Sequence, residues 1–422
     1  MKKENNNSFG ILGFIFAFIM PILGLIFSII GFKRCKSKTV ENLSIAGAII
    51  SVVFLLVLII LGISSLGLNS PIVTIIYLVL MLGLLIFVHE LGHFIAAKKI
   101  GVYVNEFALG MGPKIFSFKR RLHNDPTEYS LRAFPIGGFC AMAGEVDEDA
   151  EGIKKNEFMC NRSKWERFLI LIAGVTMNVI TAFVILFLQG LIYGSTEQKS
   201  IVGYVPEGYP ISEAGIEVGD KVIKLNGYKI GTWDKMTLVL NLKHKSDTYE
   251  FVVKKKDGSV KTYNVTPKTE KDEEGNDRQV FGIGAGTEVY KGFVPSIKFA
   301  FSKLGSIIST MYIIIGSLFT GKLGLSSLSG PVGMYSIVGE SAKVGFQSIM
   351  YLTAYLGVNL AVINSLPFPA FDGGRILFVI IEAIKGSKVN AKTENIFHTV
   401  GFIILMLLMV YITIQDIIRL AH

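Results

Sequence analysis

The sequence predicts a polytopic α-helical membrane protein with about six transmembrane helices. Of its 422 residues, 51% are hydrophobic and only 18% are charged, and the mean hydropathy is +0.52. Soluble proteins contain roughly 25% charged residues, so this chain has too few polar side chains to cover its apolar mass in water. The composition also excludes disordered and collagen-like chains, and three irregularly spaced cysteines argue against a disulfide-rich secreted scaffold.

Six stretches approach the ~20 apolar residues that cross the hydrocarbon core of a bilayer. They cover residues 11–32, 46–63, 72–97, 168–193, 349–383 and 399–418. A further apolar stretch, residues 307–319, would reach only ~20 Å as a helix. We therefore expect it to lie in the outer membrane interface without crossing.

The net charge of +9 indicates how these helices are oriented. Lys and Arg cluster after the first and third spans, before the fourth, and between the last two: Lys33, Arg34, Lys36, Lys38, Lys98, Lys99, Lys114, Lys119, Arg120, Arg121, Arg162, Lys164, Arg167, Lys385, Lys388 and Lys392. Basic loops stay in the cytoplasm, which predicts that the polar segment after the fourth span is extracytoplasmic. Because lysines far outnumber arginines, the usual readers of bases, we expect no nucleic-acid partner.

The third span contains an HExxH motif, His89-Glu90-Leu91-Gly92-His93. On a helix, the four-residue spacing places both imidazoles on one face, where they can bind one Zn²⁺ with Glu90 beside them as general base. The alternative is a packed histidine pair with no metal. Two histidines and a glutamate are costly inside an apolar span unless paired or metallated, so a functional site is the stronger interpretation.

A catalytic zinc needs a third protein ligand, and Asp372 is the candidate. It ends the run Asn364-Ser-Leu-Pro-Phe-Pro-Ala-Phe-Asp372 and is followed by two glycines. The prolines and glycines break the fifth span, and unwound backbone at membrane depth must line a cavity or be buried in protein. Counting ~1.5 Å per residue places His89 and Asp372 at similar depths. The alternative for Asn364 and Asp372 is a structural hinge.

These two motifs, in this order, resemble those of the site-2 protease family of intramembrane zinc metalloproteases, in its bacterial PDZ-containing form (regulator of sigma-factor protease type). The resemblance covers about residues 72–420. It implies that His89, His93 and Asp372 bind Zn²⁺, that Glu90 is the catalytic base and that Asn364 binds substrate. It also implies a plasma-membrane location, an active site near the cytoplasmic side, and substrates that are single-span membrane proteins such as anti-sigma factors or remnant signal peptides.

Two further segments resemble parts of that family. Residues 107–145 look like its membrane-associated β-hairpin, for which we expect strands at 115–118 and 128–132. Residues 214–227 resemble the core of a PDZ domain, which implies binding of peptide C-termini. The expected organisation is an N-terminal two-span module (1–68), the first half of the protease core (69–195), a PDZ domain (196–290), an interfacial helix and loop (291–345) and the second half of the core (346–422).

One competing function is compatible with the same residues. The chain would be a non-enzymatic membrane adaptor that uses its PDZ domain, with a structural zinc site. A purely structural site has no use for Glu90 beside its ligands, which favours the protease.

Overall fold

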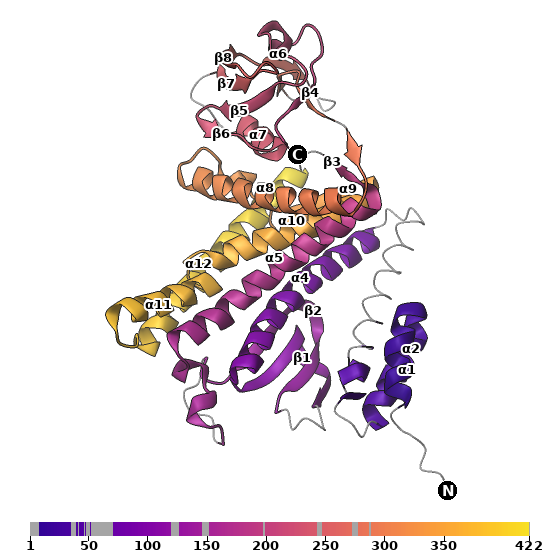
Figure 1. Cartoon of the computed structure of the whole chain (residues 1–422). Helices are drawn as coiled ribbons and strands as arrows, with labels where there is room; N and C mark the ends of the chain where they lie inside the picture. Colours follow the sequence, from indigo (N-terminus) through magenta and orange to yellow (C-terminus); the bar gives the residue numbers. More distant parts are fainter. Residues whose placement is uncertain are drawn as a thin grey trace. The chain divides into compact units, whose positions relative to one another are not determined.

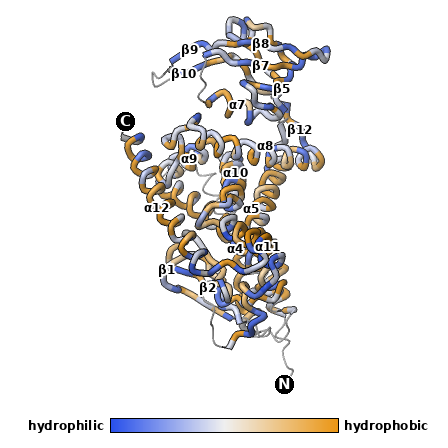
Figure 2. Tube along the Cα trace, turned by 90° about the vertical axis from the view of Figure 1, so that its left-hand side faces the viewer, coloured by the Kyte–Doolittle hydropathy of each residue, from blue (hydrophilic) through white to orange (hydrophobic). Residues whose placement is uncertain are grey.

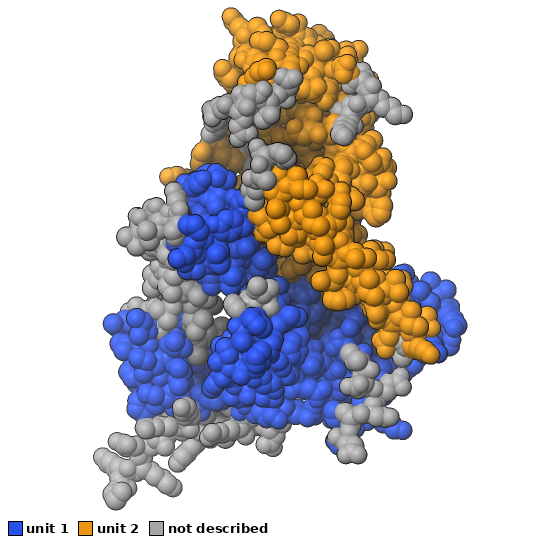
Figure 3. Space-filling model, turned by 180° about the vertical axis from the view of Figure 1, so that it is seen from behind, with its two compact units in different colours: residues 1–177, 334–349, 375–390 blue, residues 178–333, 350–374, 391–422 orange. Residues whose placement is uncertain are grey.

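Figure 1 shows the computed structural model of the chain. The structure describes residues 8–34, 39–40, 42–45, 47, 51, 71–119, 126–145, 152–196, 199–242, 247–271, 277–286 and 288–421. The chain forms two compact units (Figure 3). One comprises residues 1–177, 334–349 and 375–390, and the other comprises residues 178–333, 350–374 and 391–422.

Five helices in the described chain are long and apolar enough to cross a membrane. They are α4 (Pro71–Ile100), α5 (Lys164–Tyr193), α8 (Phe293–Phe319), α10 (Phe346–Ser365) and α12 (Ala391–Ala421). Figure 2 shows that α5 and α12 are mostly hydrophobic. Large apolar side chains such as Phe402 and Leu407 are more than half exposed on α12, as expected where a helix faces lipid. The chain is therefore a polytopic membrane protein.

The first predicted span, residues 11–32, is wrong as a single helix. The structure instead has α1 (Ser8–Ile19) and α2 (Pro21–Arg34). Proline lacks the backbone N–H that a helix interior needs but suits a first turn, so a new helix begins at Pro21.

Small residues then let α2 return antiparallel to α1. A Cβ built on Gly13 would lie 2.5 Å from the Ser28 backbone nitrogen, and one built on Gly31 would lie 2.5 Å from the Gly10 Cα. Backbones approach this closely only where side chains are absent. Most of the second predicted span, residues 46–63, lies outside the described residues.

The hairpin strands are longer than predicted. β1 (Val104–Lys119) and β2 (Glu128–Met142) contain the expected segments but extend well beyond them. Residues 106–109 pair with 138–141 on one side and with 128–131 on the other, and 128–131 also pair with 116–119. Two bent strands thus make a four-segment sheet. Phe107 anchors it to α4, between the rings of Phe87 and Phe94.

After the hairpin, the chain forms two short 3₁₀ turns, η1 (Lys155–Glu157) and η2 (Met159–Asn161), and then α5. Near the end of the chain, α9 (Pro331–Val344) precedes α10, and α11 (Asp372–Lys385) follows it. Ile376 and Val379 of α11 belong to one buried cluster with Ala97 of α4 and with Ile170 and Leu171 of α5. These helices form the core of the first unit.

Residues after α5 form a small α/β domain with its own hydrophobic core, which includes the fully buried Ile211, Met236 and Phe251. Its main antiparallel sheet has the order β6-β5-β7-β8. Its elements are β3 (Ser195–Thr196), β4 (Val202–Tyr204), α6 (Pro210–Glu213), β5 (Lys221–Leu225), β6 (Tyr228–Lys229), α7 (Trp233–Asn241), β7 (Tyr249–Lys254), β8 (Val260–Val265), β9 (Lys268–Lys271), β10 (Asp277–Val280), β11 (Gly284–Ala285) and β12 (Val289–Tyr290).

The helix expected at residues 307–319 is twice as long as predicted. α8 spans Phe293–Phe319, 27 residues, or ~40 Å, so the length argument against a crossing no longer holds. The α/β domain lies on the first half of α8 in both Figures 1 and 2. Lys303 of this half forms a 2.8 Å ion pair with Asp234 of α7. A short turn, η3 (Leu325–Ser327), follows α8.

The fifth predicted span breaks where its prolines predict. α10 ends at Ser365 and α11 begins at Asp372. Between them, Ala370 adopts a φ of 71°, a left-handed conformation that is uncommon for a residue with a side chain. The break thus sets Asn364 at the end of one helix and Asp372 at the start of the next.

Candidate metal centre

Helix α4 presents the two predicted histidines to a common point. His89 and His93 are 7% and 6% exposed, and their Nε2 atoms lie 3.2 Å apart. The Nδ1 of His93 lies 2.8 Å from the Ile170 carbonyl oxygen of α5. Because that carbonyl can only accept, Nδ1–H donates, and the lone pair of Nε2 remains for a metal. A backbone carbonyl commonly orients a metal-binding histidine in this way.

Two glycines allow α5 to approach this pair. A Cβ on Gly92, inside the motif, would lie 2.4 Å from the Ala173 carbonyl oxygen. A Cβ on Gly174 would lie 2.5 Å from His93 Nε2 and 2.9 Å from His89 Cε1. The space in front of the imidazoles therefore exists because Gly174 has no side chain.

Asp372 completes a three-residue group. The ligand atoms of His89, His93 and Asp372 all lie within 4.8 Å of one another. Two imidazoles and one carboxylate are a donor set that catalytic zinc sites use, and ligand atoms of a tetrahedral site lie ~3.3 Å apart. The three ligand atoms are therefore close enough to bind a single Zn²⁺ placed between them.

Glu90 and Asn364, the other predicted site residues, are both partly buried. A Cβ on Gly138 of β2 would lie 3.7 Å from Glu90 Cγ, so one edge of the hairpin sheet runs beside Glu90. Asn364 lies one residue before the end of α10, at the break.

Sequence reasoning overlooked two acids within the predicted spans. Glu382 of α11 is 3% exposed and forms a 2.5 Å ion pair with Arg167 of α5. Asp416 of α12 is 2% exposed and accepts hydrogen bonds of 2.8 Å from the backbone N–H groups of Gly330 and Gly333, at the start of α9. Both are structural. Their signal was present in the sequence, because an acid in an apolar helix needs a partner.

A third overlooked acid contacts α11. Glu145, just after the hairpin, forms an ion pair with Arg375 of α11. Arg375 lies one turn after Asp372 on α11. The Glu145–Arg375 ion pair therefore joins α11 to the segment that follows the hairpin.

The chain matches the model of peptidase family M50 over residues 77–408. It is 38% identical over 348 residues to a protein of Fusobacterium nucleatum named as a zinc metalloprotease, covering 82% of this chain and 98% of that protein. A similarly named protein of Clostridium perfringens is 38% identical over 347 residues, with coverage of 82% and 98%. The regulator of sigma-W protease RasP of Bacillus subtilis is 30% identical over 424 residues, with coverage of 82% and 99%.

These similarities span both predicted motifs and favour an enzyme over the adaptor. Together with the His-His-Asp group, they identify zinc as the metal. The chain belongs to peptidase family M50, the site-2 proteases, and is a membrane-embedded zinc metalloprotease.

Proposed function

We propose that this protease hydrolyses peptide bonds within the transmembrane segments of single-span membrane proteins, with zinc held by His89, His93 and Asp372. The observation that supports this most is the convergence of these three ligand atoms within 4.8 Å, two of them from α4, a helix long and apolar enough to cross a membrane. Zinc acts at such sites as a Lewis acid that makes water a better nucleophile near neutral pH. Glu90 accepts the proton of the attacking water and delivers it to the leaving amine.

Asn364 is proposed to bind the substrate. Its position at the end of α10 places a side-chain amide at the break that leads to Asp372. An amide donor at that point can hold the substrate backbone or stabilise the oxyanion that develops on the scissile carbonyl. Removal of one such donor typically costs about 10²–10³ in kcat.

The hairpin edge at residues 138–141 is proposed to hold the substrate extended. Among the described residues, 138–141 pair with β1 through one side, and Gly138 lies beside Glu90. A substrate strand added to this edge would expose its peptide bonds next to the general base. A photo-crosslinking amino acid at Phe139, in a Glu90→Gln background, should capture the substrate. The same group at Phe118, on the opposite edge, should not.

The α/β domain is proposed to be a PDZ-like module that binds cut C-termini. It carries a groove of about 1110 Å³ whose lining includes Trp233, Met236 and Leu240 of α7 on one side and Phe281 and Ile283 on the other. The full chain should bind a peptide ending in a free carboxylate more tightly than the matched C-terminal amide. Leu240→Arg, which places a charge in the groove at a partly buried position, should abolish the difference.

Substrate identity and topology remain predictions. One relative is named as a regulator of sigma-W, which supports anti-sigma factors as the substrate class beside remnant signal peptides. The basic loops support an extracytoplasmic α/β domain and an active site near the cytoplasmic side. The N-terminal module (1–68) and the other expected domain boundaries also stay predictions.

Glu90→Gln tests the proposed mechanism. It removes the base while keeping the shape of the side chain, so cleavage of a single-span substrate should vanish while the zinc content stays at one per chain. Asp372→Ala should lose the zinc. Cleavage retained by Glu90→Gln, or zinc retained by Asp372→Ala, would contradict the assigned roles.

A further inference from the structure

The break between α10 and α11 is held by a histidine outside both motifs. The N–H of Ala370 donates a hydrogen bond to Nδ1 of His398, on α12, over 3.0 Å. Ala370 is also the residue whose φ of 71° is strained for a side chain. Such a conformation persists only when its surroundings determine it, and the His398 contact is one such restraint.

The face of α12 around His398 is shaped to the break. Gly401 lies one turn further along the same face, and a Cβ on it would lie 1.9 Å from Pro369 Cβ. A Cβ on Gly374, on the other side of the break, would lie 3.2 Å from His398 Cε1. The imidazole of His398 thus lies between Ala370 and the first turn of α11.

We propose that His398 is a positioning residue of the protease, which fixes Ala370 and thereby the direction in which α11 presents Asp372. The proposal rests on the proposed role of Asp372 as a zinc ligand. His398 is proposed to contact neither the scissile bond of the substrate nor the metal. It acts through two residues of backbone, because Ala370 and Asp372 are separated only by Phe371.

The chemistry of the contact suggests two rescues. Because Nδ1 accepts from Ala370, the ring proton of His398 lies on Nε2, and an asparagine carbonyl oxygen can replace Nδ1 as the acceptor. Glycine adopts positive φ without strain, so Ala370→Gly lowers the need for the restraint. A residue that served only to fill space would be rescued by neither change.

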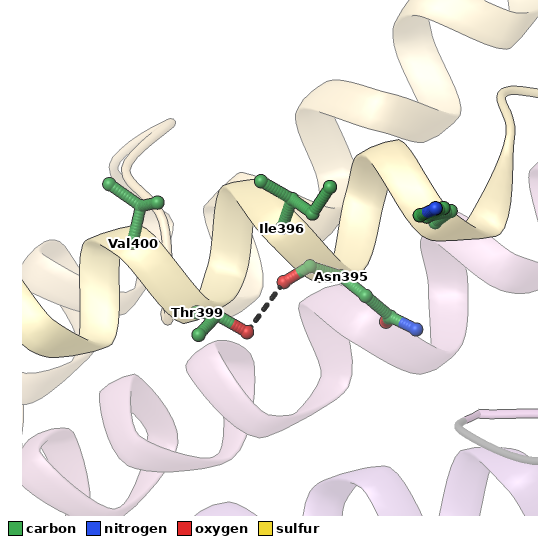
Figure 4. Close-up of a pocket in the computed structure, with 5 residues that line it drawn as sticks. Asn395, Ile396, Thr399 and Val400 are labelled. Atoms are coloured by element: carbon green, nitrogen blue, oxygen red, sulfur yellow. Dashed lines mark hydrogen bonds between the residues drawn. The ribbon is translucent and has the colours of Figure 1, made fainter.

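Thr399 provides the matched control. It is the next residue of α12, but it is exposed and its hydroxyl donates to the Asn395 carbonyl oxygen one turn back, over 2.8 Å. Figure 4 shows this bond within a shallow hollow whose described lining, Lys392, Asn395, Ile396, Thr399 and Val400, comes from α12 alone. Thr399→Val therefore perturbs the same helix without touching the break.

The test uses purified full-length variants with two readouts, the rate of zinc loss to a chelator and the rate of cleavage of a single-span substrate. His398→Ala should speed zinc loss and slow cleavage by about 10- to 100-fold, as changes behind metal ligands do. His398→Asn, and His398→Ala combined with Ala370→Gly, should recover most of both rates. Thr399→Val should match the wild type.

Two outcomes separate this inference from the proposed function. If Asp372→Ala loses zinc but His398→Ala keeps wild-type zinc retention and cleavage, the role of His398 is wrong and the ligand set stands. If Asp372→Ala keeps its zinc, the ligand set itself fails. Loss in His398→Ala with no recovery in either rescue would also overturn the positioning role.

Discussion

Glu106 is the acid at the centre of the hairpin sheet. Burial raises its pKa, but hydrogen bonds from Ser130 and Arg132 and the charges of Arg132 and Lys114 outweigh this and hold the pKa below its ordinary value of 4.5. The shortest contacts are 2.5 Å to the Ser130 hydroxyl and 2.8 Å to Arg132 Nη2. A carboxylate held in this way stabilises the fold above its unfolded pKa, and that contribution is lost as the pH falls through the lower folded pKa.

Glu106→Gln should therefore destabilise the hairpin by about 1–3 kcal/mol at pH 7. Thermal unfolding and limited proteolysis across the hairpin measure this. The difference in stability from wild type should shrink as the pH falls below 4.5, because the carboxylate of the unfolded wild-type chain begins to protonate there while the folded one is still ionised. Glu128→Gln, which alters contacts to Lys114 and Ser117 near the surface of the hairpin, should change little. A wild-type advantage that grew towards low pH would contradict this assignment.

Gly174 offers a second test at the residue scale. A Cβ there would meet His93 Nε2 at 2.5 Å and His89 Cε1 at 2.9 Å. Either the imidazoles or α5 must shift, so Gly174→Ala should weaken zinc binding by about tenfold or more. Gly316→Ala, in the last turn of α8 with nothing within 4 Å of its added methyl, is the control. Equal zinc affinity in both variants would show that Gly174 does not keep the space in front of the imidazoles open.

Individual residues were predictable where a local pattern carried them. The HExxH spacing places His89 and His93 on one helical face whatever the rest of the chain does. His398 has no such pattern, because it meets the break through tertiary contacts, including one with a residue 28 positions away. The partners of Glu382 and Asp416 are likewise fixed by tertiary packing.

At the scale of elements, α7 of the α/β domain contacts α8. Asp234 of α7 pairs with Lys303 over 2.8 Å and accepts a 3.0 Å hydrogen bond from Ser306. The ammonium of Lys303 also lies 4.9 Å from the ring centroid of Tyr351, on α10. One lysine thus links the domain to two apolar helices.

Asp234→Ala should loosen this junction, because it removes the ion-pair partner of Lys303 and one hydrogen-bond acceptor of Ser306. We expect faster amide hydrogen exchange in α7 and the first half of α8, equivalent to about 1–3 kcal/mol. Asp257→Ala is the control, since Asp257 contacts Ser259 within the turn between β7 and β8. Unchanged exchange in Asp234→Ala would show that apolar packing alone holds the domain.

The predictions that were wrong concern the bounds of single elements. Apolar runs reveal that a segment is helical but not where it turns. Residues 11–32 fold back where glycines on α1 and α2 meet. In α8, Lys298 and Lys303 interrupt the apolar run that the prediction used, although the helix continues through both, and Lys303 pairs with Asp234. The hairpin strands were underestimated because residues 106–109 pair on both sides, which no local alternation reveals.

For the whole molecule, the sequence predicted the membrane class, the protease family and the metal correctly. Composition decides between water and membrane, and the His-His-Asp donor set decides the metal. What the sequence left open was how distant segments meet, including the contact of Ala370 with His398. These contacts give the broken helix its shape.

The most direct test of the account is to locate the bond that the purified chain cuts in a single-span substrate reconstituted in lipid vesicles. Mass spectrometry of the products should place the cut inside the apolar span, and the products should be absent with Glu90→Gln that retains its zinc. A cut outside the span, or the same products from Glu90→Gln, would contradict intramembrane proteolysis by this centre.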